Sequence, residues 1–337
     1  MFFLALGVLA GPAYPMYAHY DFSHSLDTRS YLKLAHGEVQ GVNVTRRYRV
    51  LVPALAAAVA APLQLVYARL WPQRMATDGP LRLAFYLVNT LLMALAGLLL
   101  YQTARLYGAT MAAAALAVAA VLSSQWAVYM SGLPLVDSLY LLLFALAFYA
   151  VQRAWGAGLA VALLLGPLAK ESFVFLVPWL LIYGRRALPW PRQLLALAVG
   201  VGLAAGVRHG IDARLGAPAA ESVANAFDHL NNLVYSLKRI LSVKGLGELF
   251  GIFGFFWLAL LPRITGRMPA LAGHSWRAAL GWPGAAFGGV VAVHMLLSGD
   301  LGRMGYLAAP VFTVALALAL PQWLPAQTPP PHAGGSS

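Results

Sequence analysis

The sequence predicts an all-α protein that crosses a membrane many times. Of its 337 residues, 61% are hydrophobic and only 10% are charged, and the mean hydropathy is +0.71. A soluble domain is about half apolar and about a quarter charged, so this little charge cannot coat a folded particle in water. The apolar residues also lie in long runs, and a spanning helix needs about 20 of them in succession. We therefore expect a polytopic transmembrane helix bundle of about 10–11 spans.

Apolar runs follow one another along the whole chain. They are Phe2–Tyr17, Leu83–Thr103, Thr110–Tyr129, Ser138–Gln152, Gly156–Ala169, Ser172–Tyr183, Gln193–Val207, Gly247–Leu261, Ala279–Leu297 and Met304–Leu320. Several are short, which indicates helices that end part-way at a cavity. Val50–Leu70 is apolar enough to be an eleventh span, but Pro53 and Pro62 interrupt it, so it could equally lie at the membrane surface.

The domain organisation is simple. Residues 1–323 are expected to form a single transmembrane domain, whose first extracytoplasmic loop covers about residues 19–82. Residues 324–337 are rich in Pro, Gly and Ser, which predicts a disordered tail.

The behaviour of Val50–Leu70 decides the sidedness of the chain. If this segment does not cross and the N-terminus is cytoplasmic, the cytoplasmic connections hold only basic charges, and all eleven Asp and Glu lie on the opposite side. If it crosses, Asp27 is separated by the bilayer from Asp137, Glu171 and Asp300. Short basic loops belong in the cytoplasm, which favours the first arrangement.

Composition and motifs exclude several classes. The net charge of +12 is scattered between apolar runs and forms no basic face, so nucleic acid is not an expected partner. The absence of cysteine excludes a thiol nucleophile, a disulfide framework and a thiolate metal site. No metal-ligand spacing, nucleophile elbow or P-loop occurs, so protease, lipase and ATPase functions have no support.

The predicted first loop contains Asp27, a carboxylate that could have either a structural or a chemical role. One interpretation is that Asp27 is the N-cap of a short helix over Thr28–His36. The other is that it is a carboxylate at the membrane surface, able to take a proton or orient a hydroxyl. One residue can do both.

Four other acidic residues, Asp137, Glu171, Glu248 and Asp300, stand where an apolar run begins or ends. Capping and local pairing explain each of them singly, but an ionisable group at membrane depth is also a functional candidate. Lys170 and Glu171 make the strongest case because apolar runs flank them on both sides. Asp300 and Arg303 are three residues apart, so on a helix they can pair.

The basic residues have two interpretations as well. Arg46, Arg47 and Arg49 could bind anionic headgroups at the surface, or grip the phosphate of a phosphorylated lipid in a bidentate fork. Arg303 is the more specific phosphate candidate because Asp300 could hold its orientation. His294 is expected to be a helix-packing histidine.

Several short features occur in a fixed order. They are Asp27…Tyr31…Ala35-His36-Gly37, Arg47-Tyr48-Arg49-Val50-Leu51-Val52-Pro53, Arg105-Leu106-Tyr107-Gly108, Gly132-Leu133-Pro134-Leu135-Val136-Asp137, Ala169-Lys170-Glu171-Ser172 and Asp300-Leu301-Gly302-Arg303. This order resembles the GT-C superfamily of integral-membrane glycosyltransferases, which includes protein O-mannosyltransferases and the aminoarabinose transferases of lipid A. The resemblance covers about residues 1–185, and implies a GT-C-like bundle with juxtamembrane helices in the first extracytoplasmic loop.

The resemblance also implies a function. It implies an inverting hexosyl transfer at the extracytoplasmic face of a bacterial inner membrane, from a polyprenyl-phosphate sugar to a lipid, glycan or protein acceptor. Asp27 and Asp137 would be catalytic, with Asp27 as the base. Lys170 and Arg303 would bind the donor phosphate, with Glu171 and Asp300 as their orienting partners. Arg47 and Arg49 would also bind the donor phosphate. No cofactor is implied. Asp27-Thr28-Arg29 lacks the second acid of the oligosaccharyltransferase metal motif, so no metal is expected.

A membrane transporter or lipid flippase is the alternative, with the intramembrane charges as its pathway. A transporter predicts related halves, and the sequence contains no such repeat. The glycosyltransferase interpretation predicts instead that Asp27, Asp137, Lys170, Glu171 and Arg303 line one cavity.

Overall fold

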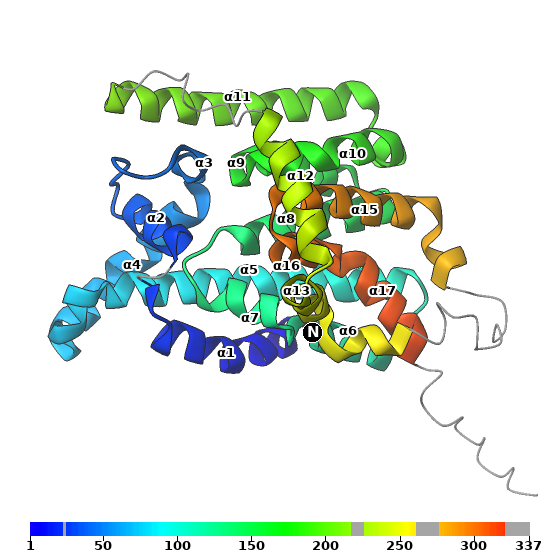
Figure 1. The fold of residues 1–337 in the computed structure, drawn as a ribbon, viewed down its shortest axis with the longest axis horizontal. Helices are drawn as coiled ribbons and strands as arrows, with labels where there is room; N and C mark the ends of the chain where they lie inside the picture. The colour runs from blue at the N-terminus through cyan, green and yellow to red at the C-terminus, as the bar shows by residue number, and fades with distance from the viewer. Residues whose placement is uncertain (23–24, 217–225, 261–275, 321–337) are drawn as a thin grey trace, which may run out of the picture.

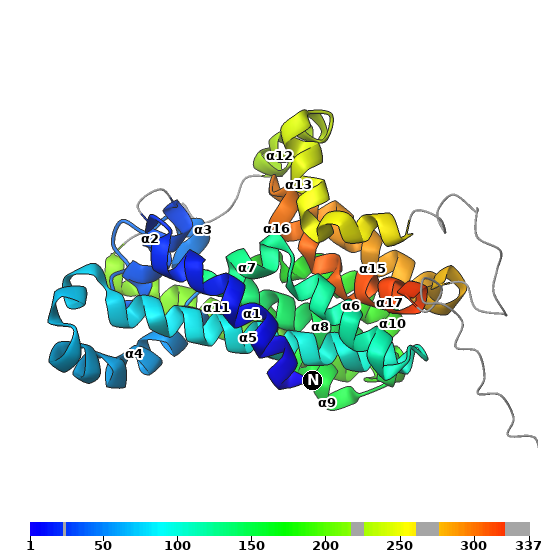
Figure 2. The ribbon, with the colours of Figure 1, turned by 90° about the horizontal axis from the view of Figure 1, so that it is seen from below.

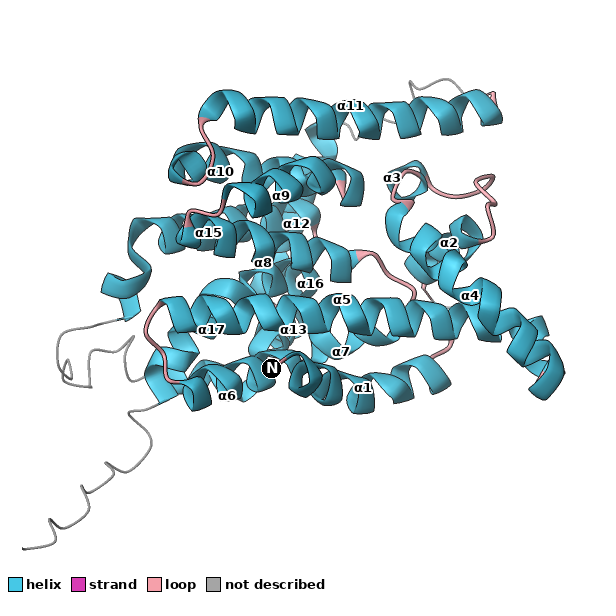
Figure 3. Cartoon of the chain, turned by 180° about the vertical axis from the view of Figure 1, so that it is seen from behind, coloured by secondary structure: helices cyan, strands magenta, loops and turns pink. Residues whose placement is uncertain are grey.

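The computed structural model describes residues 1–22, 25–216, 226–260 and 276–320. In this part of the chain all regular elements are helices, joined mostly by short loops (Figure 3). The predicted all-α fold is confirmed. The predicted disordered tail, residues 324–337, lies outside the described residues.

Six helical segments are long and apolar enough to cross a membrane within the described ranges. Three of them are single helices, α4 (Leu51–Leu70), α5 (Gly79–Leu106) and α11 (Trp190–Leu215). The fourth is α13 (Val243–Phe253) with the 3₁₀ helix that continues it to Leu260, and the fifth is the part of α15 (Trp276–Ser298) from Leu280 on. The sixth is Leu301–Ala319, which contains α16 (Leu301–Gly305) and α17 (Ala309–Ala319). A seventh is counted if α6 (Met111–Leu122) and α7 (Gln125–Gly132) form one broken span. The chain is therefore an integral membrane protein.

The other predicted spans are present as helices that are too short or not apolar enough to be counted among the six. They are α1 (Phe2–His19), α8 (Asp137–Arg153), α9 (Gly156–Ala169), and the pair η3 (Glu171–Leu176) and α10 (Val177–Tyr183). The predicted span Thr110–Tyr129 is bent by 66° between α6 and α7. The Ser124 hydroxyl accepts a hydrogen bond from the backbone N–H of Ala127 at 3.2 Å and so starts a new helix at the bend. The predicted number of spans is larger because it includes these helices as well as the broken pair.

The helices are arranged around two hydrophobic clusters. In Figure 1, the axes of α1, α5 and α11 lie roughly horizontal, and α2 (Leu26–Ala35), α3 (Val44–Arg47) and α4 gather at one end. Figure 2 shows α12 (Ala226–Ile240) and α13 projecting from the body. The larger cluster holds the second half of α5 with α6, α8 and α17, and the smaller holds α2, α4 and the first half of α5.

The helix α4 packs along only half of α5. Its buried residues share the smaller cluster with α5 residues from Leu81 to Leu92, whereas α5 from Met93 onwards belongs to the larger cluster. Half of α5 is about 20 Å long at 1.5 Å per residue, which is less than the roughly 30 Å of a hydrocarbon core. The contact with α5 thus covers part of a bilayer's thickness, while α4 itself has 20 residues and is one of the six segments able to cross. The expectation that prolines interrupt the helix is wrong, since Pro62 lies inside it and Pro53 lies in its first turn, where the backbone N–H is not needed.

Reporter fusions test this sidedness. A fusion after Met75, which precedes α5, is expected to report the extracytoplasmic side, and a fusion after Leu106, at the end of α5, the cytoplasmic side. The reason is that α5 has 28 residues and is the longest apolar helix described. A paired alkaline phosphatase and fluorescent protein assay distinguishes the two sides. A cytoplasmic signal at Met75 would place α4 across the bilayer.

Candidate active site

A cavity of about 610 Å³ opens where α2 and α3 meet η3, α12, α15 and α16. We call it the charged cavity. It is lined by Asp27, Thr45, Arg46, Arg49, Lys170, Glu171, Ser172, Val174, Phe175, Asn231, Asn232, His294, Leu297, Ser298, Asp300, Arg303 and Met304. Four of the five residues predicted to share one cavity are in this lining, and the fifth, Asp137, lies directly behind it.

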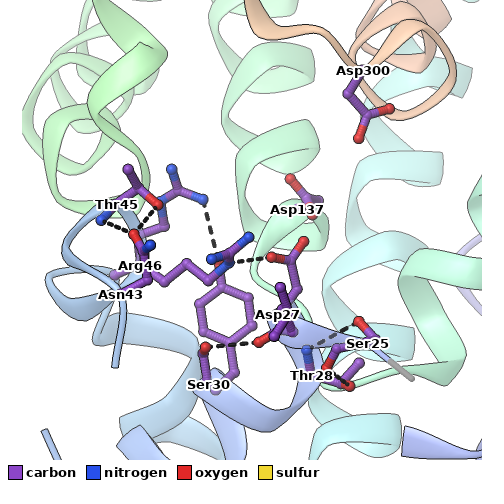
Figure 4. A network of polar contacts seen from close by, with 12 residues as sticks. Ser25, Asp27, Thr28, Ser30, Asn43, Thr45, Arg46, Asp137 and Asp300 are labelled. Carbon is purple, nitrogen blue, oxygen red and sulfur yellow. Dashed lines mark hydrogen bonds and ion pairs between the residues drawn. The ribbon is translucent and has the colours of Figure 1, made fainter. Parts of the chain in front are cut away.

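Asp27 lies in the first turn of α2 and carries two ion pairs. One carboxylate oxygen accepts a hydrogen bond from Arg303 Nη1 at 2.8 Å, and the other accepts one from Arg46 Nε. Figure 4 shows Asp27 reaching toward Arg46, with Asp137 and Asp300 on neighbouring elements. Burial favours the protonated form of Asp27, but the two guanidinium groups outweigh burial and hold the pKa of the carboxyl below its ordinary value. Asp27 is therefore an anion at neutral pH.

Arg303 is the centre of the ionic network. Its Nε lies 2.5 Å from Asp300 Oδ2, and its Nη1 lies 2.8 Å from Asp27 and 3.4 Å from Asp137. Asp300 is the N-cap of α16 and also accepts the backbone N–H of Arg303 at 3.0 Å, so the predicted pairing on one helix face is present. A Cβ at Gly302 would collide with the Trp126 indole, so glycine is needed for α16 to sit this close to α7.

Asp137 and Lys170 form a buried ion pair behind Arg303. Lys170 Nζ donates to Asp137 Oδ1 at 3.0 Å, and the two side chains are 10% and 3% exposed. The loop before α8 is fixed by Asn89, whose amide nitrogen donates to the carbonyls of Leu133 and Leu135 at 2.8 and 3.1 Å. Burial holds the pKa of the Lys170 amine below its ordinary value, although Asp137 acts in the opposite direction.

Glu171 faces the other side of the cavity and binds Arg49. The Arg49 guanidinium donates to both oxygens of Glu171 and to the Tyr31 hydroxyl at 3.2 Å. Burial opposes ionisation of Glu171, but Arg49 holds the pKa of its carboxyl below the ordinary value. Burial raises the pKa of Tyr31 to about 12, so this hydroxyl stays protonated. This pair joins η3 to the segment before α4.

Three details of the predicted site are wrong. The N-cap of α2 is Ser25, whose hydroxyl accepts from Thr28 N at 3.3 Å, so Asp27 is free to bind arginines. Arg47 does not reach the cavity, because its guanidinium donates to the Val42 carbonyl at 3.1 and 3.2 Å. Lys170 is held by Asp137, whereas its sequence neighbour Glu171 binds Arg49.

The far wall of the charged cavity is neutral and polar. It is formed by Asn231 and Asn232 of α12 and by His294 of α15. His294 is 1% exposed, and its ring lies 4.9 Å from Phe175 and 5.8 Å from Tyr140 between ring centres. The predicted packing role is thus present, but Nδ1 of His294 is buried without a hydrogen-bond partner. A polar group of a ligand could satisfy it.

Sequence reasoning missed part of this site. Arg46, rather than Arg47, reaches Asp27. The sequence could not show which of the two arginines faces the cavity, because α3 has only four residues and so no helical periodicity to read. The asparagines of α12 had no local pattern that marked them. Glu248, considered as a candidate, is instead paired with Arg239 nine residues earlier. Among the described residues, no three or more His, Asp or Glu lie close enough together to hold a metal ion.

Comparisons of the chain with known protein families, with curated proteins and with solved structures find no match. The function must therefore be inferred from the residues of the charged cavity and from the order of features in the sequence.

Proposed function

We propose that the protein is a GT-C-type glycosyltransferase that moves a sugar from a polyprenyl-phosphate donor to an acceptor hydroxyl. One observation carries the proposal. The anionic Asp27 lies 2.8 Å from Arg303, which is 276 residues away in the sequence, in a cavity that also contains Lys170 and Arg49. Sugar transfer from a phosphate needs a base for the incoming hydroxyl and cations for the leaving group. The charged cavity contains both.

The proposed reaction uses these groups directly. The acceptor oxygen attacks the anomeric carbon from the face opposite the phosphate, so the configuration inverts. The bond from that carbon to the phosphate oxygen breaks, its electrons leave with the phosphate, and the acceptor proton passes to Asp27. Arg303, Lys170 and Arg49 supply the positive charge that stabilises the departing phosphate. Phosphate is already a good leaving group, so the proposed step uses no cofactor.

Binding of the donor phosphate would also increase the basicity of the Asp27 carboxylate. Arg303 is shared between Asp27, Asp137 and Asp300 in the structure, so an incoming phosphate competes with these carboxylates for its N–H groups. As Arg303 turns toward the phosphate, Asp27 loses a cationic neighbour and becomes a stronger base. Donor binding would thus prepare the base for the acceptor.

The remaining walls fit an amphiphilic donor. Val174, Phe175 and Leu297 form an apolar side, and Val174 is 62% exposed on the surface of the helix bundle. A polyprenyl chain could leave the cavity along this side into the bilayer. Asn231, Asn232 and Ser172 offer the neutral hydrogen-bonding groups that sugar hydroxyls need.

We place this activity at the extracytoplasmic face of an inner membrane. Two arguments support that placement. The charged cavity is lined in part by Asp27 of α2 and by Thr45 and Arg46 of α3, which belong to the predicted first extracytoplasmic loop. The positive-inside rule assigns the short basic connections to the cytoplasm, which leaves the acidic connections on the outer side.

A donor assay tests the proposal. The purified protein in lipid nanodiscs is incubated with polyprenyl phosphates that carry different labelled sugars, and release of polyprenyl phosphate is measured with and without candidate acceptors. We expect at least one donor to be consumed in the presence of an acceptor. A parallel assay in liposomes follows movement of the same donors between leaflets. Leaflet movement without release of polyprenyl phosphate would contradict the proposal and favour a flippase.

A further inference from the structure

A second cavity, of about 300 Å³, lies between the end of α1, η2 (Pro72–Thr77) and the start of α5. We call it the arginine–tyrosine pocket. It is lined by Tyr14, Tyr17, Ala18, His19, Arg74, Thr77, Gly79 and Arg82. It shares no residue with the charged cavity, and the proposed sugar transfer gives it no role.

The lining of this pocket is basic. Arg74, Arg82 and His19 contribute to it, and no carboxylate does. Asp21 and Asp78 act electrostatically on Arg82 without lining the pocket, and Asp78 accepts a hydrogen bond from His36 Nε2 at 3.0 Å. In the charged cavity, by contrast, every cation has a carboxylate bound to it. The arginine–tyrosine pocket therefore offers positive charge to an anion from outside the chain.

Arg82 is held in place with part of its hydrogen-bonding capacity unused. Its guanidinium lies 3.8 Å from the centre of the Phe22 ring, and Nη2 donates to the Tyr17 carbonyl at 3.3 Å. Its Nε is buried without a hydrogen-bond partner. A guanidinium has five N–H groups in a fixed fork that matches phosphate oxygens. A phosphate in the pocket would satisfy groups that the chain leaves open.

The surroundings resemble a membrane interface. Tyr17 and Tyr86 stack with ring centres 5.3 Å apart, and Tyr14, which lines the pocket, is 53% exposed. Tyrosines are enriched at the level of lipid headgroups. On the side of Tyr14 the surface of α1 is apolar and open, since neither Gly7 nor Gly11 has any atom within 4 Å of where a Cβ would lie. An acyl chain would find room beside a headgroup at this point.

We propose that the arginine–tyrosine pocket binds a phosphate group, and that this phosphate belongs to the headgroup of an anionic phospholipid. A free phosphate ion offers the same chemistry, but the open apolar face of α1 beside the pocket favours a lipid. The pocket also connects to the helix that carries Asp27. Phe22, which packs on Arg82, accepts a hydrogen bond through its carbonyl from the Thr28 hydroxyl at 3.2 Å. A lipid bound at Arg82 would thereby help to fix the start of α2.

Native mass spectrometry of the delipidated protein tests this site. Phosphatidylglycerol, phosphatidylcholine and inorganic phosphate are titrated in turn into the wild type and the variants Arg82→Gln, Arg74→Gln and Arg69→Gln. Arg82→Gln loses charge-assisted hydrogen bonds and should bind phosphatidylglycerol about tenfold more weakly. Arg74→Gln should weaken binding less, and because the Arg74 side chain is exposed, this variant should fold as the wild type does. Arg69, exposed on α4 and outside the pocket, is the matched control and should bind as the wild type does.

The possible results distinguish a lipid site, a site for a soluble anion and the absence of a site. Weaker binding of phosphatidylglycerol in Arg82→Gln and Arg74→Gln, but not in Arg69→Gln, supports the lipid site. Binding of inorganic phosphate that is lost in the same two variants supports the phosphate site and assigns it to a soluble anion. Binding of phosphatidylcholine as tight as that of phosphatidylglycerol, or equal binding of every ligand by all four proteins, would overturn the proposal. This assay measures no sugar transfer, so its outcome is independent of the proposed enzyme activity.

Discussion

Replacing Asp27 with asparagine is expected to slow sugar transfer about 10²–10⁴-fold, the usual contribution of a general base. Asparagine has nearly the shape of aspartate, and its carbonyl oxygen can still accept a hydrogen bond from Arg46 or Arg303. It cannot accept a proton from an acceptor hydroxyl, so the loss should fall on kcat. The measurement is the initial rate of polyprenyl phosphate release at saturating donor, with the amount of folded protein determined by size-exclusion chromatography.

Asp78→Asn is the matched control for this experiment. Asp78 is a half-exposed aspartate outside the charged cavity, paired with His36. Its φ of 55° lies in the left-handed region, where asparagine is also tolerated. The control makes the same chemical change and should keep the rate of the wild type. Full turnover by Asp27→Asn would exclude Asp27 as the base, whatever the identity of the donor.

The fold class was predictable because lipid imposes a strong rule on the sequence. Every spanning segment must satisfy its own backbone hydrogen bonds, so long apolar runs become helices. The rule does not say where a helix bends or stops. Thr110–Tyr129 reads as one apolar run, and yet a serine hydroxyl at position 124 caps a new helix inside it. Val50–Leu70 forms a continuous helix despite Pro62, because packing against α5 supports the helix where a backbone hydrogen bond is missing.

The residues of the site were predictable, but their partners were not. Ionisable side chains at the ends of apolar runs are few, so Asp27, Asp137, Lys170 and Arg303 stood out in the sequence. Pairing between them depends on how distant segments approach each other, and the sequence contains no measure of that. Lys170 and Glu171 are adjacent, but η3 begins between them and turns their side chains to different partners. Only Asp300 and Arg303, within one helical turn, could be paired from spacing alone.

Asp137→Asn is expected to destabilise the protein more than Lys170→Met, although both break the same ion pair. In Asp137→Asn, the ammonium of Lys170 stays buried without a counter-ion. The asparagine Oδ1 can still accept its hydrogen bond, and its other neighbours are the Met304 sulfur at 3.5 Å and the Tyr140 ring, whose centre is 5.1 Å away. Removing one partner of a buried pair in this way costs about 3–5 kcal/mol. Without Lys170, Asp137 still has Arg303 at 3.4 Å, so its charge remains compensated. Thermal unfolding midpoints in the same detergent should therefore fall in the order wild type, Lys170→Met, Asp137→Asn.

The double variant and the pH dependence separate this explanation from a general loss of packing. Asp137→Asn combined with Lys170→Met removes both charges and should be more stable than Asp137→Asn alone. Burial already lowers the pKa of Lys170, and without Asp137 it must fall further. A lysine with a lowered pKa in the folded state binds fewer protons there than in the unfolded state, so stability rises with pH. The deficit of Asp137→Asn relative to the wild type should accordingly shrink between pH 7 and pH 10. If the deficit is constant over that range, or if Lys170→Met is the less stable single variant, the buried ammonium is not what destabilises Asp137→Asn.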